Sequence, residues 1–332
     1  MSVRLAFLGV AHVHAPGYAA LLRTHPDVEL LGFSEDDAGQ ARTFAERSGL
    51  KHLPEADLLA QQPGGVIVCA ENARRLAPVQ AAAAAGAHIL CEKPIATTLA
   101  DAQAMRVACE RAGVRFVTAF PARFSPAARS LAAALPSLGG VLAYSGVNHS
   151  VAPDRVQPWF SDPLLAGGGA GMDHIVHLAD LLRLFGEVPT QVYAQLLPVQ
   201  EWTIAQHPDT DAAGLVSLTL ASGAVASIDC SWSRPPGYPR WGELRLEVVA
   251  ERGLYTLDLF AEILKVTGES RTWAGYGADL DAALLTDFLR VCRTGQPGAA
   301  TWQDGYEALR VVRAAYASVR SGQPTALTGN GV

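Results

Sequence analysis

The sequence predicts an α/β protein in which a doubly wound parallel sheet is followed by an α+β part with an open, mainly antiparallel sheet. Short β-branched or leucine-rich runs alternate with helical segments up to about residue 120. After Phe120, apolar and polar residues alternate strictly in several segments. A length of 332 residues gives room for two domains. We therefore predict one domain over residues 1–120 and a second over residues 121–332.

The strands of the first domain are expected to be covered by helices on both faces, because their apolar residues run on with little alternation. Thr98 and Asp101 are spaced for a capping box at the start of a helix, and Gly113 is suited to the left-handed position at its end. The predicted strands are Val3–Leu8, Val28–Phe33, Val66–Ala70, His88–Cys91 and Val114–Ala119, and the predicted helices lie near Pro16–Thr24, Ala38–Ser48, Glu55–Gln61, Arg74–Ala85 and Leu99–Ala112.

The second domain shows the period of two that half-buried strands have, over residues 226–233 and 243–248. Such strands present one apolar face, and an open sheet of this kind is usually covered by a helix or a partner. We therefore expect a homodimer or homotetramer formed through this sheet. Further strands are predicted at Gly139–Asn148, Thr190–Leu197, Ala213–Leu220 and Gly253–Phe260. One helix is predicted at Met172–Phe185, and a second, capped by Thr301 and Asp304, runs to Ser321.

Composition argues against several classes of partner. The chain has 26 basic and 32 acidic residues, a net charge of −6, and lacks the basic surface that nucleic-acid binding requires. No apolar run approaches the roughly 18 residues of a membrane-spanning helix. Five cysteines, an odd number without a C-x-x-C pair, are typical of reduced thiols, and we expect a cytoplasmic protein.

The first strand–helix turn is an altered phosphate-binding loop. A dinucleotide fingerprint has glycine at the positions that Gly9, Ala11 and His14 occupy, so only the first glycine is present. The acidic residue expected about 20 residues on is present as Glu35, whose carboxylate would favour NAD over NADP. The loop alone is compatible with a dinucleotide site or with a plain strand–turn–helix. His12 and His14 could contact phosphate or substrate; we expect no metal, because no acidic residue is close in sequence.

Two segments carry a more specific signal. Residues 91–98 read Cys-Glu-Lys-Pro-Ile-Ala-Thr-Thr, and residues 167–180 contain a glycine run followed by Asp173 and His177. Together they resemble the glucose–fructose oxidoreductase / inositol dehydrogenase / rhizopine-catabolism (Gfo/Idh/MocA) family over nearly the whole chain. The resemblance implies a Rossmann domain that binds NAD(P), a second domain for substrate binding and oligomerisation, and oxidation of a secondary alcohol of a sugar or cyclitol.

The same resemblance implies where the site residues lie. Lys93 would lie beside the nicotinamide, and Asp173 and His177 would face the substrate. Asn72 matches a common asparagine after the third strand. Cofactor contacts are expected from Gly9, Ala11, His12, Val13, Glu35, Asn72, Glu92 and Lys93, and substrate contacts from Lys93, Arg123, His149, Trp159, Asp173 and His177.

The chemistry of hydride removal suggests a role for each member of the catalytic set. The hydroxyl proton must leave as the hydride does, and histidine has the pKa range that a base for this step needs. Asp173 and His177 are four residues apart, on one face of a helix, so the carboxylate could orient the imidazole. Lys93 would stabilise negative charge on the reacting oxygen. Zinc binding by His174 and His177 is an alternative that the spacing also allows.

Two other functions stay open at this level. Some relatives cleave glycosides by transient oxidation with tightly held NAD, and one branch of the family has lost catalysis and senses the dinucleotide as a regulatory subunit. The eroded glycine loop favours the sensor, whereas the presence of Lys93, Asp173 and His177 favours the enzyme.

Overall fold

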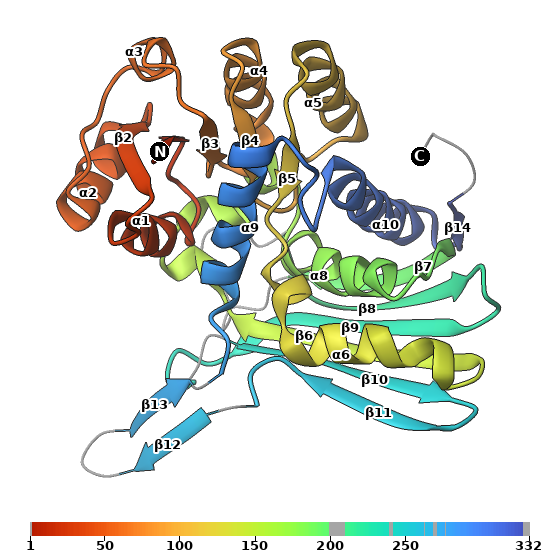
Figure 1. The fold of residues 1–332 in the computed structure, drawn as a ribbon. Coiled ribbons are helices and arrows are strands. Elements are labelled where there is room, and N and C mark those ends of the chain that lie inside the picture. Colours follow the sequence, from red (N-terminus) through yellow and green to blue (C-terminus); the bar gives the residue numbers. More distant parts are fainter. Residues whose placement is uncertain are drawn as a thin grey trace. The chain divides into compact units, whose positions relative to one another are not determined.

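The computed structural model describes residues 2–198, 210–238, 242–261, 263–267, 271–275 and 277–327. The chain forms two compact units, each with its own sheet (Figure 1). The first unit comprises Met1–Pro121, Leu164–Gly167 and Asp281–Tyr306, and the second comprises Ala122–Pro163, Gly168–Leu280 and Glu307–Val332.

A five-stranded parallel sheet lies at the centre of the first unit, in the order β2-β1-β3-β4-β5. This confirms the predicted doubly wound fold. The strand order reverses between β1 and β3, and ligands of such sheets bind at the carboxyl ends beside this switch point. The elements are β1 (Val3–Leu8), α1 (Ala15–Arg23), β2 (Val28–Ser34), α2 (Ala38–Ser48), α3 (Glu55–Ala60), β3 (Gly65–Val68), the 3-10 turn η1 (Asn72–Arg74), α4 (Leu76–Ala84), β4 (His88–Cys91), α5 (Leu99–Ala112) and β5 (Phe116–Thr118).

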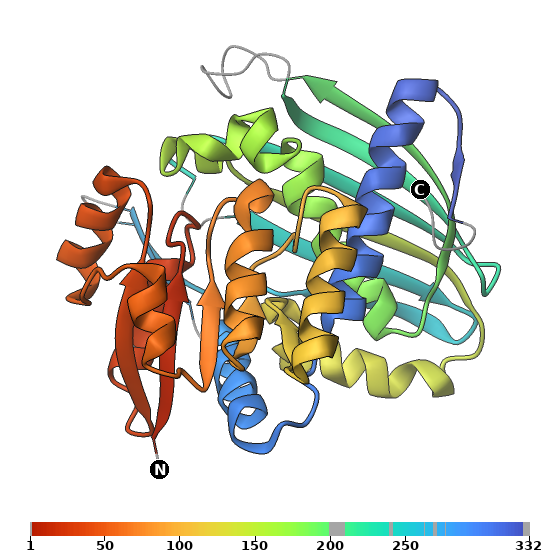
Figure 2. The ribbon, with the colours of Figure 1, turned by 90° about the horizontal axis from the view of Figure 1, so that it is seen from above.

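Helix α5 begins and ends where the sequence indicates. The Thr98 hydroxyl accepts a hydrogen bond from the Asp101 amide and donates one to its carboxylate, which confirms the capping pair. Helix α5 ends at Gly113, whose φ of +68° is left-handed. Helices α4 and α5 lie side by side against the sheet (Figure 2).

Later segments of the chain complete the first unit. Helix α9 (Leu280–Thr294) packs on the sheet so closely at Gly65 that a Cβ there would lie 2.9 Å from the Phe288 ring. Helix α9 was not predicted from the sequence, although its buried residues recur at helical spacing: Leu284, Leu285, Phe288, Leu289 and Val291. The short helix α6 (Pro126–Ala134) of the second unit was not predicted either.

A seven-stranded, mainly antiparallel sheet forms the second unit, in the order β11-β10-β6-β9-β8-β7-β14, with one parallel pair, β6 and β9. Helices α6, α8 (Ala170–Leu184) and α10 (Trp302–Ser321) lie along one face of it (Figure 1). Alternate residues of β6 meet α8, and a Cβ at Gly146 would lie 2.8 Å from Leu178. The strands are β6 (Val141–Val151), β7 (Pro189–Pro198), β8 (Asp211–Leu220), β9 (Val225–Arg234), β10 (Gly242–Ala250), β11 (Gly253–Asp258) and β14 (Thr325–Ala326), while β12 (Ile263–Thr267) and β13 (Arg271–Gly275) pair separately.

All five cysteines are free thiols, as expected, and four of them are buried. Burial raises the pKa of Cys91 and Cys109 to about 12, so both stay protonated at neutral pH. Among the described residues, no helix has both the length and the apolar character of a membrane span.

Candidate active site

The loop after β1 keeps the geometry of a phosphate-binding turn despite its altered sequence. Gly9 has a φ of +72°, and a Cβ there would lie 2.6 Å from the Cβ of Ala70, so this position requires glycine. Ala11 at the second position is fully buried. The loop leads into the N-terminus of α1, which has no side-chain cap. Helix N-termini of this kind attract phosphate groups.

Glu35 lies beside this loop, as the fingerprint requires. Its Oε2 accepts a hydrogen bond of 2.9 Å from the Val10 amide, and its Oε1 accepts one from the Asp37 amide. The carboxylate therefore has a fixed position next to the phosphate loop, where ribose hydroxyls would meet it.

Asn72 offers a second polar contact near the carboxyl end of the sheet. It is buried in η1, and its Nδ2 donates to the Ala166 carbonyl at 2.9 Å. Its Oδ1 is buried and has no hydrogen-bond partner among the described residues. A buried acceptor of this kind is costly unless a ligand donor satisfies it. Gly9, Glu35 and Asn72 together fit a dinucleotide.

Lys93 lies two residues after the end of β4, and hydrogen bonds fix the backbone on both sides of it. The neighbouring Glu92 is buried, and its Oε2 accepts the Lys93 amide at 3.1 Å. The fully buried Arg75 donates to the carbonyls of Glu92, at 2.9 Å, and of Pro94. The backbone that carries the Lys93 ammonium is thus fixed from a strand end and from the turn before α4.

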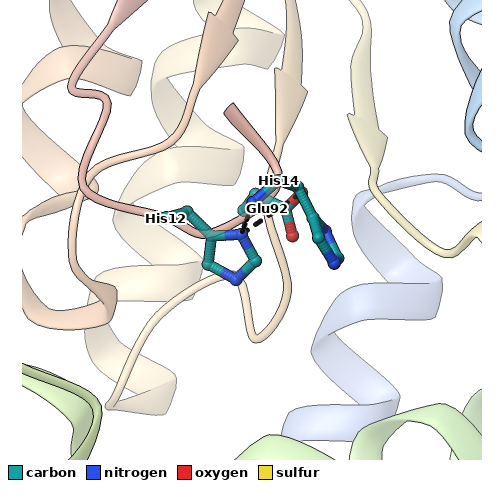
Figure 3. Close-up of side chains that lie close together, drawn as sticks. All are labelled: His12, His14 and Glu92. Carbon is teal, nitrogen blue, oxygen red and sulfur yellow. Dashed lines mark hydrogen bonds and ion pairs between the residues drawn. The ribbon is translucent and has the colours of Figure 1, made fainter. Parts of the chain in front are cut away.

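His12 and His14 converge on the same Glu92 carboxylate (Figure 3). Its Oε1 lies 3.0 Å from the Nδ1 atom of His14, 3.7 Å from that of His12, and 2.7 Å from the Tyr18 hydroxyl, which donates to it. Sequence analysis found no acidic residue near the two histidines because Glu92 is almost 80 positions away. The only signal that could have found it is that β1 and β4 end at the same edge of a parallel sheet.

The charges around this cluster favour a proton over a metal ion. The two imidazoles and the carboxylate lie within 4.8 Å of one another, a spacing that metal ligands also have. However, the positive charges of Arg75 and Lys93 act on the same cluster. A divalent cation would add two more charges to two cations that are already buried. We therefore assign no metal to it.

In the second unit, helix α8 carries Asp173 and His177, and its N-terminus is held by two distant side chains. The Asp211 carboxylate accepts the amides of Gly169, at 2.9 Å, and Gly171, at 2.7 Å. The Tyr316 hydroxyl donates to Asp211 at 2.6 Å. A Cβ on Gly169 would collide with the Asp211 carbonyl, which explains the glycine run before the helix. We call Asp211 and Tyr316 the α8 clamp.

The side chains of Trp232 and His174 hold the Asp173 carboxylate. Its Oδ2 lies 3.1 Å from the indole nitrogen of Trp232, which donates to it, and 3.2 Å from Nε2 of His174. His174 is buried and also contacts the Ser150 hydroxyl at 3.1 Å. His177 lies one turn after Asp173 and is partly exposed. His174 thus contacts both Asp173 and Ser150 through its Nε2 atom. Among the described residues, no group with the spacing of metal ligands includes His174.

The remaining predicted substrate contacts lie elsewhere in the second unit. The Arg123 guanidinium is buried and binds both carboxylate oxygens of Asp180, at 2.9 Å each. His149 lies on the sheet face away from α8 and pairs with the exposed Asp229. Trp159 is buried and stacked on a neighbouring ring, that of Phe160. Each of these three residues thus has a partner in its own surroundings.

Comparison with known proteins agrees with the fold and the motifs. Residues 3–120 match the model of the oxidoreductase family with an NAD-binding Rossmann fold, and residues 135–256 match the GFO/IDH/MocA C-terminal domain. Myo-inositol dehydrogenase Hyg17 of Streptomyces leeuwenhoekii is 30% identical over 80% of this chain and 82% of its own. Inositol 2-dehydrogenase of Acidothermus cellulolyticus is 27% identical, over 96% and 93%.

Among solved structures, GenD2 from gentamicin A biosynthesis, crystallised with NAD, superposes with a TM-score of 0.86 at 23% identity, over 99% of this chain and 97% of that one. The similarity in structure confirms the fold, and the two matching family models cover most of the sequence. The chain therefore belongs to the Gfo/Idh/MocA family of oxidoreductases.

Proposed function

We propose that this protein is an NAD-dependent dehydrogenase that oxidises a secondary alcohol of a sugar or cyclitol. The observation that carries the proposal is the fixed position of Lys93, which Glu92 and Arg75 hold at the carboxyl end of β4 in a unit with a phosphate loop. Relatives over most of the chain are named as dehydrogenases of inositols and sugars. None of those relatives is named as a glycosidase or a regulatory subunit, so the two alternative functions lack support.

The dinucleotide would lie across the switch point between β1 and β3, at the carboxyl ends of the parallel strands. Gly9, Ala11, His12 and Val13 would face its phosphates, Glu35 would accept its ribose hydroxyls, and Asn72, Glu92 and Lys93 would lie toward the nicotinamide. When bound, NAD supplies the acceptor for the hydride.

The chain's own residues would accept the proton of the substrate hydroxyl and stabilise the negative charge on its oxygen. We assign His177 as the base that takes the proton of the substrate hydroxyl. Lys93 stabilises the negative charge that develops on that oxygen. Asp173, fixed by Trp232 and His174, orients the substrate and the imidazole. Lys93 belongs to the first unit and the other two to the second, and their meeting on one substrate is part of this proposal.

Arg123 is better suited to supporting α8 than to binding substrate, because Asp180 on that helix takes up its guanidinium. Contacts from His149 and Trp159 to the substrate stay predictions.

The function is tested by incubating the protein with NAD or NADP and a panel of cyclitols, aldoses and sugar acids while following the absorbance of the reduced cofactor. Reduction of NAD by at least one polyol is expected. If neither dinucleotide bound below millimolar concentration in calorimetry, the proposal would be wrong.

Replacing Glu35 by serine is expected to weaken NAD binding about tenfold and NADP binding by less. The serine removes the acceptors for the ribose hydroxyls and also the carboxylate that repels a 2′-phosphate. Titration calorimetry with both dinucleotides measures the ratio. Glu46→Ser, on the exposed side of α2, is the control and should leave both affinities unchanged. Equal losses for the two dinucleotides would contradict the role of Glu35.

We also propose that two copies of the chain associate through the helix-free face of the large sheet. Apolar side chains that are at least 38% exposed gather there: Tyr193, Leu215, Val225 and Val249. Leu215→Glu is expected to lower the mass seen by light scattering to that of a monomer. The control is Leu164→Glu, on the short helix α7 (Pro163–Ala166) outside the sheet. A monomeric wild-type protein would contradict the proposal. A cytoplasmic location stays a prediction.

A further inference from the structure

We propose that His14, in its protonated form, is the counter-ion of the buried Glu92 carboxylate, and that this ion pair positions Lys93. His14 occupies the place of the third glycine in the dinucleotide fingerprint. A glycine at this position could not make the contact that His14 makes, in which its Nδ1 atom lies 3.0 Å from Oε1 of Glu92 (Figure 3). The part that concerns Lys93 rests on the proposed function, whereas the charge state of His14 does not.

Glu92 needs a counter-ion because its side chain is wholly buried. Three donors reach its oxygens: the Tyr18 hydroxyl and the His14 ring at Oε1, and the Lys93 amide at Oε2. Burial alone would raise the pKa of Glu92, but the imidazoles and Arg75 lower it well below its usual range. Glu92 is therefore a carboxylate, not an acid.

Of the two histidines, His14 is the one that can carry the proton. The Nδ1 atom of His12 accepts a hydrogen bond of 3.3 Å from the His14 amide, so this nitrogen has no proton in that arrangement. Burial lowers the pKa of His12 well below its ordinary value, and the charges of His14, Arg75 and Lys93 lower it further, although Glu92 opposes them. Of the two imidazoles, His14 is therefore the one whose charged form its surroundings favour.

The surroundings of His14 favour its charged form. Burial lowers its pKa, but the charge and hydrogen bond of Glu92 outweigh this, so the pKa of His14 is raised. The charged or titratable groups around it are His12 from the loop, Tyr18 from α1, Glu92 and Lys93 from the end of β4, and Asp281 from α9. Burial and Glu92 raise the pKa of Tyr18 well above its usual value, so its hydroxyl stays a donor.

The link to Lys93 is one of backbone position. The carboxylate that His14 neutralises accepts the Lys93 amide, and Arg75 binds the carbonyls on both sides of Lys93. If the His14 proton leaves, Glu92 has lost its counter-ion and the turn that carries the ammonium loses a support. Because the pKa of His14 is raised in the folded protein, this support is present at low pH and is lost as the pH rises through the raised pKa.

The charge state is tested without any activity measurement. In an NMR titration of protein with labelled histidine, the His14 signal, assigned by its loss in His14→Gln, should titrate above the ordinary value for histidine. Glu92→Gln should bring it back toward that value. A His14 that titrates at or below the ordinary value in the wild-type protein would overturn the inference, whether or not Glu92→Gln folds. So would tight Zn²⁺ binding that His14→Gln abolishes, because a metal ion would then be the counter-ion.

The positioning role is tested by kinetics. His14→Gln keeps an N–H donor without the charge, and kcat should fall about 10- to 100-fold while the KM for NAD changes little. The loss of kcat/KM that the wild type shows as pH rises through the His14 pKa should be absent. His25→Gln, in the turn after α1, is the control and should match the wild type in both. A wild-type kcat and pH profile in His14→Gln would overturn the positioning role. Absence of any turnover by the wild type would refute the proposed function, while the NMR result would still decide the ion pair.

Discussion

Replacing Lys93 by alanine is expected to lower kcat/KM for the true substrate by about 10²- to 10³-fold, the effect of removing one group that stabilises charge in the transition state. The backbone that carries the Lys93 ammonium is fixed by hydrogen bonds on both sides of the residue, and alanine leaves that backbone in place while it removes the charge. Initial rates of NAD reduction at saturating cofactor measure it. Lys51→Ala, at an exposed position of the same unit, is the matched control and should retain the wild-type rate.

His177→Ala, combined with Lys93→Ala, tests whether the two proposed catalytic residues act on one substrate. Loss of the general base alone should cost about 10²- to 10⁴-fold. If Lys93 and His177 act on the same oxygen, the double variant should lose far less than the product of the two single effects, since residues that act as a unit are not additive. Multiplicative losses would mean that the two side chains serve separate sites, and the proposed mechanism would fail.

Asp211→Ala is expected to lower the free energy of unfolding of the second unit by about 3–4 kcal/mol, because hydrogen bonds to a buried charged group are among the strongest in proteins. The substitution removes the carboxylate that accepts from the amides of Gly169 and Gly171 and from the Tyr316 hydroxyl, and the Gly169 amide keeps only its contact with that hydroxyl. Urea unfolding followed by tryptophan fluorescence measures the change. The α8 clamp also sets where the helix begins, so KM for the substrate should rise with the loss of stability.

Asp229→Ala is the matched control for this prediction. Asp229 lies on the neighbouring strand and pairs with His149, but it is exposed. Surface ion pairs contribute between zero and about 1 kcal/mol, so the control should unfold at nearly the wild-type urea concentration. Tyr316→Phe, which deletes one hydroxyl of the clamp, should lie between the two. An Asp211→Ala protein as stable as the control would mean that water caps the helix equally well.

The element types and the fold class could be predicted from the sequence because they depend on local physics. Continuous apolar runs separated by helix caps, such as Thr98 with Asp101, predict covered parallel strands wherever they occur. Strict alternation after residue 225 predicts half-covered antiparallel strands in the same way. Helix α9 was not predicted, although its apolar residues recur at helical spacing. The strand residue it packs on, Gly65, lies more than two hundred residues earlier in the chain, so no neighbouring residue indicates this contact.

The candidate site was only partly predictable, because its supports are long-range. The motif residues Lys93, Asp173 and His177 were identified from their neighbours in sequence. The groups that hold them were not: the α8 clamp comes from a strand and a helix about 40 and 145 residues further on. Arg75, which binds the carbonyls on both sides of Lys93, lies about 18 residues before it and carries no signal of that role in the sequence.

Periodicity and hydrogen bonds between near neighbours were enough to predict the two sheets and most of their helices, α6 and α9 excepted. Which buried charges meet depends on contacts between distant parts of the chain, so it became visible only in the folded protein. A carboxylate such as Glu92 can stay ionised in the interior only where opposite charges reach it. In this chain the groups that lower the pKa of Glu92 are His12, His14 and Arg75, which the parallel sheet brings to one edge.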